Sequence, residues 1–168
     1  MEQAAPGVRG LIYVVRRFSA DFAAAKRSRR VLDFGDLEHR TLDLLLGKSR
    51  SGPTAAAKEI ARRFREVLVD EYQDSNAVQD AIFTVLTDQK RNCFLVGDVK
   101  QSIYRFRLAD PGIFLQKYQT FADAVSVSDS SDRKVLLSHN FRSGGEVIAA
   151  VNDVFSVCMS PEVGGLRY

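Results

Sequence analysis

The stretch VLVDEYQDSN, residues 67–76, joins three consecutive aliphatic residues to an adjacent pair of acids, Asp70 and Glu71. A short continuous apolar run is typical of a strand buried on both faces, as in a parallel sheet. Two acids at the end of such a strand are either ordinary turn residues or a site for a metal ion and a water molecule. The surrounding sequence has to decide between these interpretations.

A second apolar run, CFLVGD, follows about 25 residues later, with a predicted helix between the two. This pattern predicts a βαβ unit and therefore a parallel sheet with helices on its faces. Ligands bind such sheets at the carboxyl ends of the strands, so we expect Asp70, Glu71 and Asp98 to lie at one edge. The expected elements are strands at 66–70, 93–98 and 135–139, helices at 76–88 and 110–122, and an exposed polar excursion at 123–134.

Helical periodicity predicts three further helices before this unit, at 10–29, 31–46 and 54–64. Asp33 is the expected N-cap of the second, and the cations of KRSRR (26–30) suit the C-terminus of the first. After the third strand, Ser143 and Glu146 have the spacing of a capping box and predict a last helix.

The bulk composition is that of an ordinary globular protein of one domain, with 168 residues, 45% hydrophobic and 27% charged. No apolar run is long enough to span a bilayer, and the two cysteines have no zinc spacing, so we expect a reduced, cytoplasmic protein without membrane contact. Residues 1–65 carry 14 Lys and Arg against 7 Asp and Glu, or +7, whereas residues 66–168 carry −4. The basic half indicates either nucleic-acid contact or solvated helices.

An apolar strand that ends in Asp-Glu suits nucleotide hydrolysis, in which the Asp holds Mg²⁺ and the Glu polarises the attacking water. Such a nucleotide site needs a phosphate-binding loop, G-x-x-x-x-G-K-[ST], between a strand and a helix. GKS occurs at 47–49, but the first glycine of the motif would have to stand at position 42, which is Leu42. The residues before GKS are also predicted to be helical. The tripeptide is therefore not expected to bind phosphate, and the chain is expected to hold half of a nucleotide site.

The segment VGDVKQSIYRFR, residues 96–107, contains further candidate functional residues. Gln101 lies just past a strand end, where its amide could contact a γ-phosphate or a water molecule. Tyr104 and Phe106 alternate with arginines, a pattern typical of single-stranded nucleic-acid binding, although core aromatics between solvated arginines have the same pattern. Arg142 lies beside a helix start, where it is either a surface residue or a group that stabilises a transferring phosphate.

In this order, the motifs resemble those of the UvrD/Rep-like superfamily 1 DNA helicases, and most closely the AddA-type subunits of the ATP-dependent helicase/nucleases. The resemblance covers roughly residues 30–156 and rests on DFGDLE (33–38), VLVDEYQDSN (67–76), FLVGDVKQSIYRFRLADP (94–111) and LSHNFRS (137–143). It implies an α/β fold, a partial RecA-like P-loop NTPase domain whose parallel sheet is flanked by helices.

The resemblance also implies roles in ATP hydrolysis. Asp70 would bind Mg²⁺, Glu71 would activate water, and Gln73 and Asp74 would complete the DExQD box. Gln101 would couple the γ-phosphate to the DNA track.

Further roles follow for the later motifs. Tyr104 and Phe106 would contact single-stranded DNA, and Arg107 would link that track to the ATP site. Phe141 would pack on the adenine, and Arg142 would be the arginine finger. Many stand-alone relatives have Trp in place of Phe106 and Tyr in place of Phe141. The resemblance therefore leaves open whether the two stacking contacts have the strength and arrangement that they have in those relatives. Helix capping is sufficient to explain Asp33 and Asp36.

These expectations define a segment of a larger protein, because the phosphate loop, later helicase motifs and nuclease carboxylates have no counterpart here. Residues 1–64 would be a helical segment from or next to an accessory subdomain, 65–140 part of the first motor domain, and 141–168 the junction toward the second. The parent would couple ATP hydrolysis to DNA translocation in double-strand break repair, with a partner subunit of the AddB type, and the isolated chain would be inactive. A stand-alone repair helicase and a non-catalytic DNA-binding scaffold are the alternatives.

Overall fold

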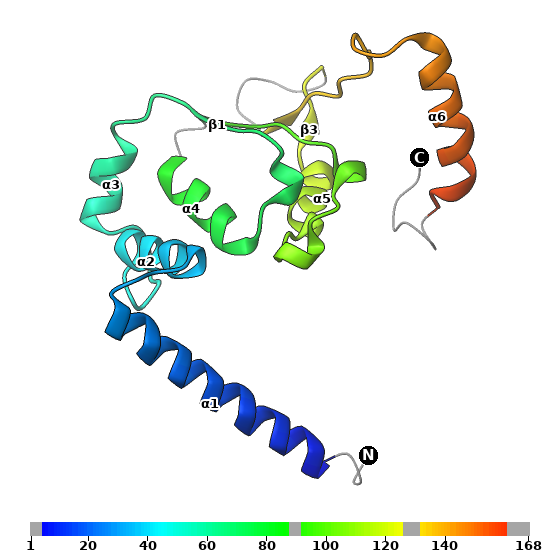
Figure 1. The fold of residues 1–168 in the computed structure, drawn as a ribbon. Helices are drawn as coiled ribbons and strands as arrows, with labels where there is room; N and C mark the ends of the chain where they lie inside the picture. Colours follow the sequence, from blue (N-terminus) through cyan, green and yellow to red (C-terminus); the bar gives the residue numbers. More distant parts are fainter. Residues whose placement is uncertain (1–4, 88–91, 126–131, 161–168) are drawn as a thin grey trace.

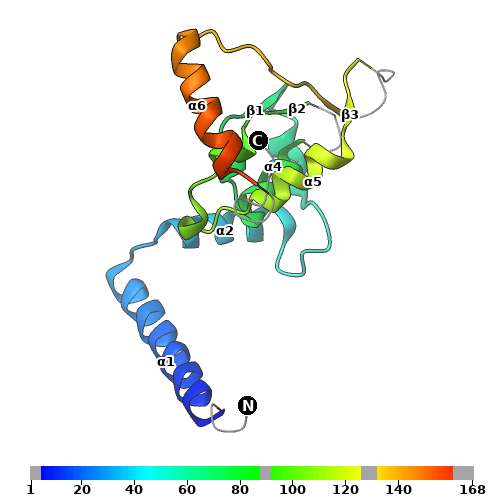
Figure 2. The same ribbon diagram turned by 90° about the vertical axis from the view of Figure 1, so that its right-hand side faces the viewer.

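The computed structural model describes residues 5–87, 92–125 and 132–160, which form helices and two small parallel sheets (Figures 1 and 2). Helix α1 projects from the body as an arm, and α6 lies at the far end of an extended segment. The α-helices and the strands of the first sheet are α1 (Ala5–Arg29), α2 (Phe34–Leu46), α3 (Ala55–Ala61), β1 (Val67–Val69), α4 (Ala77–Thr87), β2 (Cys93–Leu95), α5 (Pro111–Thr120) and α6 (Gly145–Cys158). The 3₁₀ turns and the strands of the second sheet are η2 (Tyr72–Asp74), η3 (Val99–Gln101), η4 (Arg105–Arg107), β3 (Ala122–Asp123) and β4 (Arg133–Lys134).

The capping prediction for α2 is confirmed. The Asp33 side chain accepts from the Asp36 backbone N–H at 2.8 Å, and the Asp36 side chain accepts from the Asp33 N–H at 3.1 Å. This reciprocal pair satisfies two N–H groups that a helix start leaves unpaired. Helix α2 consequently begins at Phe34, so residues 31–33 lie outside it.

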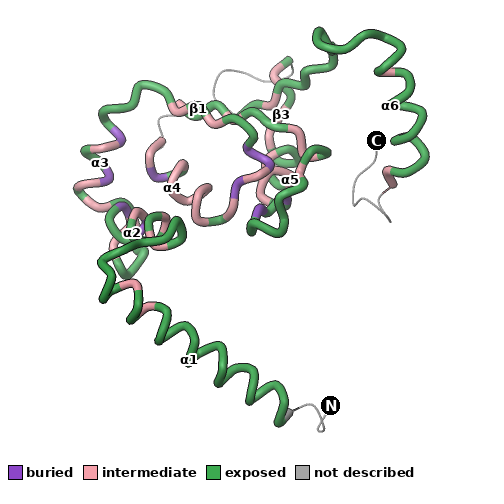
Figure 3. The backbone as a smooth tube through the Cα atoms, in the orientation of Figure 1, coloured by how far each residue is buried: buried purple, intermediate pink, exposed green. Residues whose placement is uncertain are grey.

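The main apolar core lies between α2, α3 and α4. Leu45, Ala57 and Val85 are buried there, with Ile60 and Ile82 packed against them. Figure 3 shows that buried positions are few and confined to the body, while α1 and α6 are almost wholly exposed. The GKS tripeptide lies at the C-terminal end of α2, where Gly47 has a positive φ of 70°, and so follows a helix and not a strand.

The predicted βαβ unit is confirmed. Strand β1 pairs with β2 in parallel, with Val67 opposite Cys93 and Val69 opposite Leu95, and α4 connects them. The prediction that both strands are buried on two faces is wrong, because Leu68 is 70% exposed and Phe94 is 60% exposed. Side chains alternate along a strand, and within the described ranges only the face that carries Val67 and Val69 is covered, in part by α4.

The third predicted strand, 135–139, is also wrong. In the described part of the chain these residues form no strand, and Leu137 is 86% exposed. An apolar run has strand propensity, but a strand also needs a partner that accepts its ladder hydrogen bonds, and none adjoins it. Pairing occurs just before, where β4 joins β3 in parallel. The exposed excursion predicted at 123–134 is therefore partly ordered, and 126–131 lie outside the described residues.

The capping box predicted for α6 is replaced by a different turn. Gly144 occupies the N-cap without a side-chain cap, and the Asn140 Oδ1 accepts from the N–H groups of Arg142 and Ser143, each at 2.9 Å. Asn140 thus forms a turn of its own before the helix, and the helix starts one residue later than the capping box predicts. Among the described residues, each helix is too short or too polar to span a bilayer.

Candidate functional site

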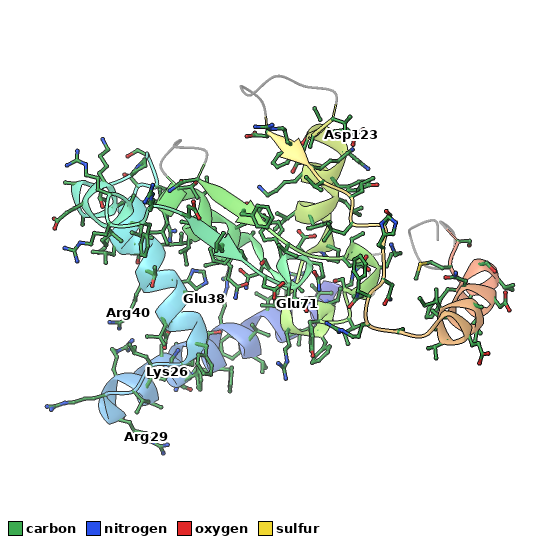
Figure 4. The ribbon with its side chains drawn as sticks, turned by 90° about the horizontal axis from the view of Figure 1, so that it is seen from above. Lys26, Arg29, Glu38, Arg40, Glu71 and Asp123 are labelled. Atoms are coloured by element: carbon green, nitrogen blue, oxygen red, sulfur yellow. The ribbon has the colours of Figure 1, made fainter. Side chains whose placement is uncertain are left out.

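The acidic strand ends meet as expected from the parallel pairing. Asp70 and Glu71 follow β1, and Asp98 follows β2. The backbone pairing continues past the strands, since the Val96 N–H donates to Val69 O and the Tyr72 N–H donates to Val96 O, both at 2.8 Å. Glu71, labelled in Figure 4, lies in the body of the molecule.

Glu71 has a left-handed backbone, with φ 50° and ψ 39°. This conformation costs roughly 1–2 kcal/mol for a residue other than glycine and is concentrated at functional sites. The turn that follows holds it in place, because the Asp74 N–H donates to Glu71 O at 3.0 Å. The left-handed backbone therefore sets the position of the Glu71 side chain, and the fold bears the free-energy cost of this conformation.

Gln73 connects the two strand ends through its side chain. Its Nε2 donates to Glu71 Oε2 at 2.5 Å, and its Oε1 accepts from the Asp98 N–H at 3.0 Å. The residue is 1% exposed, so water does not compete for either hydrogen bond. The buried amide fixes the Glu71 carboxylate relative to the segment that leads to Gln101.

Gly97 makes this connection possible. A Cβ at this position would lie 2.4 Å from Gln73 Oε1, and 3.2 Å from both Gln73 N and Phe114 Cε2. Gly97 is not among the residues with positive φ, so the glycine is needed for space and not for its backbone conformation. Sequence analysis missed this role, although a glycine between a strand and an acid is a signal of close approach.

The Tyr72 side chain anchors the turn that follows β1, because it contacts both α4 and α5. It is 1% exposed, its hydroxyl donates to Asp80 on α4, and its ring lies 5.9 Å from that of Phe114 on α5. Lys117 Nζ lies 3.3 Å from the same Asp80 carboxylate. Burial, together with the Asp80 hydrogen bond, raises the pKa of the Tyr72 hydroxyl well above its usual value. The turn that carries Glu71 is thus fixed from both sides.

Gln101 lies beside Asp98 and not in an isolated position. Its Nε2 donates to Asp98 Oδ2 at 3.1 Å, while Asp98 Oδ1 accepts from the Lys100 N–H at 3.0 Å and lies 3.5 Å from Lys100 Nζ. Asp98 therefore caps η3 and holds Gln101 at the same edge as Gln73.

Tyr104, Phe106 and Arg107 form one exposed cluster. The two rings lie 5.8 Å apart, and the Arg107 guanidinium lies 5.3 Å from the Tyr104 ring and 5.6 Å from the Phe106 ring. Two exposed aromatic rings with one guanidinium group close to both provide π surfaces and a positive charge at the same place. The alternative of a buried aromatic pair does not apply to these residues, since Phe106 is 76% exposed.

Phe141 and Arg142 are placed apart from this edge. Phe141 is 95% exposed and its ring stacks on His139 at 6.1 Å. Across the described residues, no hydrogen bond, ion pair or ring contact joins either side chain to Asp70 or Glu71. The structure thus brings together Asp70, Glu71 and Gln101, and leaves the two residues of the last motif outside.

Asp70 offers one carboxylate oxygen to a magnesium ion. Its Oδ1 accepts from the Glu71 N–H at 2.9 Å, and among the described residues no hydrogen bond involves its Oδ2. Within the described ranges, no three His, Cys, Asp or Glu side chains gather to form a metal cage. One carboxylate fits Mg²⁺, which commonly takes its remaining ligands from water and substrate phosphates.

A second connection that sequence analysis missed joins α2 to the acidic turn. Gln79 Nε2 donates to Glu38 Oε1 at 2.8 Å, and Gln79 lies in the first turn of α4. Asn76 Oδ1 accepts from the N–H groups of Val78 and Gln79, each at 2.9 Å. The motifs at 33–38 and 67–76 are therefore in contact through the start of α4.

Comparison with known proteins matches residues 10–122 to the family described as UvrD/REP helicase N-terminal domain. Proteins named as the A subunits of ATP-dependent helicase/nucleases are similar over almost the whole chain. Those of Pelotomaculum thermopropionicum and Staphylococcus aureus strain MRSA252 are 46% and 43% identical over 100% of the chain, and that of Ligilactobacillus salivarius is 46% identical over 96%. The chain spans only 14%, 14% and 13% of these relatives, respectively.

Proposed function

Because the chain belongs to the UvrD/REP helicase N-terminal domain family, we propose that it supplies the water-activating half of an ATP-hydrolysing site in a DNA helicase. The observation that carries this proposal is the buried Gln73 amide, which holds Glu71 and Asp98 together at the edge where ligands bind parallel sheets. In this proposal residues 65–140 are part of a RecA-like motor domain, 1–64 an accessory helical segment, and 141–168 the junction toward a second motor domain.

The chemistry follows from the positions of four side chains. Glu71 orients and polarises the water that attacks the γ-phosphate, and Gln73 keeps its carboxylate in place. Asp70 would hold the Mg²⁺ that neutralises charge on the phosphates. Gln101, hydrogen-bonded to Asp98 at this edge, precedes the aromatic cluster in the chain and would transmit the state of the γ-phosphate.

The aromatic cluster would form part of the single-stranded DNA track. Tyr104 and Phe106 offer faces on which bases can stack, and Arg107 adds a cation for the backbone. Phe141 and Arg142 would join the ATP site only after a movement of the segment that carries them. The proposal assigns them to adenine packing and to stabilisation of the transferring phosphate.

The named relatives support the finer assignment to an AddA-type helicase/nuclease, which would act in the cytoplasm on double-stranded DNA ends with a second subunit of the AddB type. In that assignment the chain is a segment of a protein about seven times as long. A stand-alone helicase and a non-catalytic scaffold are the competing assignments.

The test uses a protein of the relatives' length that carries this segment. Glu71→Gln should lower ATP hydrolysis in the presence of single-stranded DNA by a factor of about 10² to 10⁴, while ATP binding persists. Glu66→Gln removes the same charge at the opposite end of β1 and should leave hydrolysis unchanged. Equal rates for wild type and Glu71→Gln would overturn the proposal and favour the scaffold. The isolated chain should not hydrolyse ATP at a measurable rate.

A further inference from the structure

The turn between α1 and α2 encloses a half-open groove of about 470 Å³ that the proposed ATP site does not use. Its lining includes one carboxylate, Asp36, and four cations from α1, α2 and the turn between them, Lys26, Arg27, Arg30 and Arg40. Figure 4 shows Lys26 and Arg40 at the end of the molecule where α1 meets α2, away from Glu71. We call this cavity the elbow groove.

Only one of the four cations is neutralised by its neighbours. Lys26 Nζ lies 2.6 Å from Asp36 Oδ2 and 2.9 Å from Asp33 Oδ2. Across the described residues, no ion pair or side-chain hydrogen bond involves Arg27, Arg30 or Arg40. The Lys26 ion pairs therefore fix the angle of the elbow, and three unpaired guanidinium groups surround the groove.

Arg30 is held in an unfavourable backbone conformation. Its φ is 54°, and the Val31 N–H donates to Lys26 O at 3.1 Å, as in a helix-ending turn that usually has glycine at this position. An arginine in the left-handed region costs roughly 1 kcal/mol relative to glycine. The strain places a cation at the groove where a glycine would serve the fold better.

We propose that the elbow groove binds backbone phosphates of DNA through Arg27, Arg30 and Arg40. A guanidinium group offers paired donors that match a phosphate, and a concave surface concentrates the field of several like charges. Val31 and Leu32 supply an apolar part of the lining, which suits the sugar beside each phosphate. The choice of DNA over another polyanion rests on the proposed helicase function.

The test measures binding of the 168-residue chain to a labelled single-stranded oligonucleotide and a duplex by fluorescence anisotropy, at several salt concentrations. Combined replacement Arg27→Gln, Arg30→Gly and Arg40→Gln should weaken binding at least about tenfold and reduce the slope of log K against log salt by about 3. Arg16→Gln, on the exposed arm outside the groove, removes one charge and should have a smaller effect than any groove variant.

Arg30→Gly separates binding from folding. It should weaken DNA binding and lower the salt slope by about 1, while its unfolding midpoint in urea stays equal or rises because the strain is removed. Unchanged binding in the triple variant would overturn the inference. A loss of DNA binding in Arg16→Gln equal to that in a groove variant would also overturn it. Equal affinity for poly-glutamate would also overturn it, because the site would then be a general polyanion surface. The Glu71→Gln hydrolysis assay judges the proposed function independently of these outcomes.

Discussion

Replacing Gly97 with alanine should destabilise the chain by acting on a single buried contact. The new Cβ would lie 2.4 Å from Gln73 Oε1, a separation at which one of the two atoms must move. Gln73 is 1% exposed, so its displaced amide cannot reach water in place of Glu71 and Asp98. The perturbation therefore breaks the hydrogen bonds that join the two strand ends.

The size of the effect follows from two contributions. Leaving a buried polar group without its partner costs about 1–3 kcal/mol, and an extra methyl group in a packed site costs about 1–3 kcal/mol. We expect a loss of about 3 kcal/mol in the free energy of unfolding of Gly97→Ala. With a urea dependence of about 2 kcal/mol per molar, the midpoint should fall by about 1.5 M.

The matched control is Gly145→Ala, where the same Cβ meets no atom within 4 Å at the start of α6. Its unfolding midpoint should stay equal or rise slightly. The double variant Gly97→Ala with Gln73→Ala removes the clashing oxygen and should lose less stability than the sum of its single variants. Strict additivity, or a change below about 0.5 kcal/mol for Gly97→Ala, would refute the steric argument.

Three further outcomes are expected in urea titrations. Tyr72→Phe should lower stability by about 1–3 kcal/mol, because Asp80 loses a buried donor, and an unchanged midpoint would contradict the anchoring role. Asn76→Ala should cost about 1 kcal/mol through loss of the α4 cap, whereas Asn76→Asp should retain most of it. Hydrogen bonds from Lys26 lower the pKa of its two aspartate partners below the usual 3.8, so their stabilisation is present above that pH and is lost as pH falls through the lowered pKa values. Lys26→Met should flatten this acid dependence below about pH 4, and an identical pH profile would exclude the ion pairs as its cause.

The sequence was sufficient to predict elements whose determinants are local. Periodicity predicted α1, α2 and α4, and the spacing of Asp33 and Asp36 supports the observed cap of α2. Burial depends on what packs against an element, and the run at 67–69 has the same composition whether one face or both are covered. Leu68 was therefore predicted to be buried and is exposed. Residues 135–137 likewise have the composition of a strand, but in the part of the chain that the structure describes no strand pairs with them.

The candidate site depends on a quantity that no local pattern contains, the register between β1 and β2. With Val69 opposite Leu95, Tyr72 reaches Val96 O, and Gly97 comes to lie against the Gln73 side chain. A shift of one residue would turn every side chain of one strand to the other face and replace Gly97 at this contact with a residue that has a Cβ. The acids could thus be predicted from composition and strand ends. Their orientation could not, because Gln73 and Asp98 are 25 residues apart and meet only in the correct register.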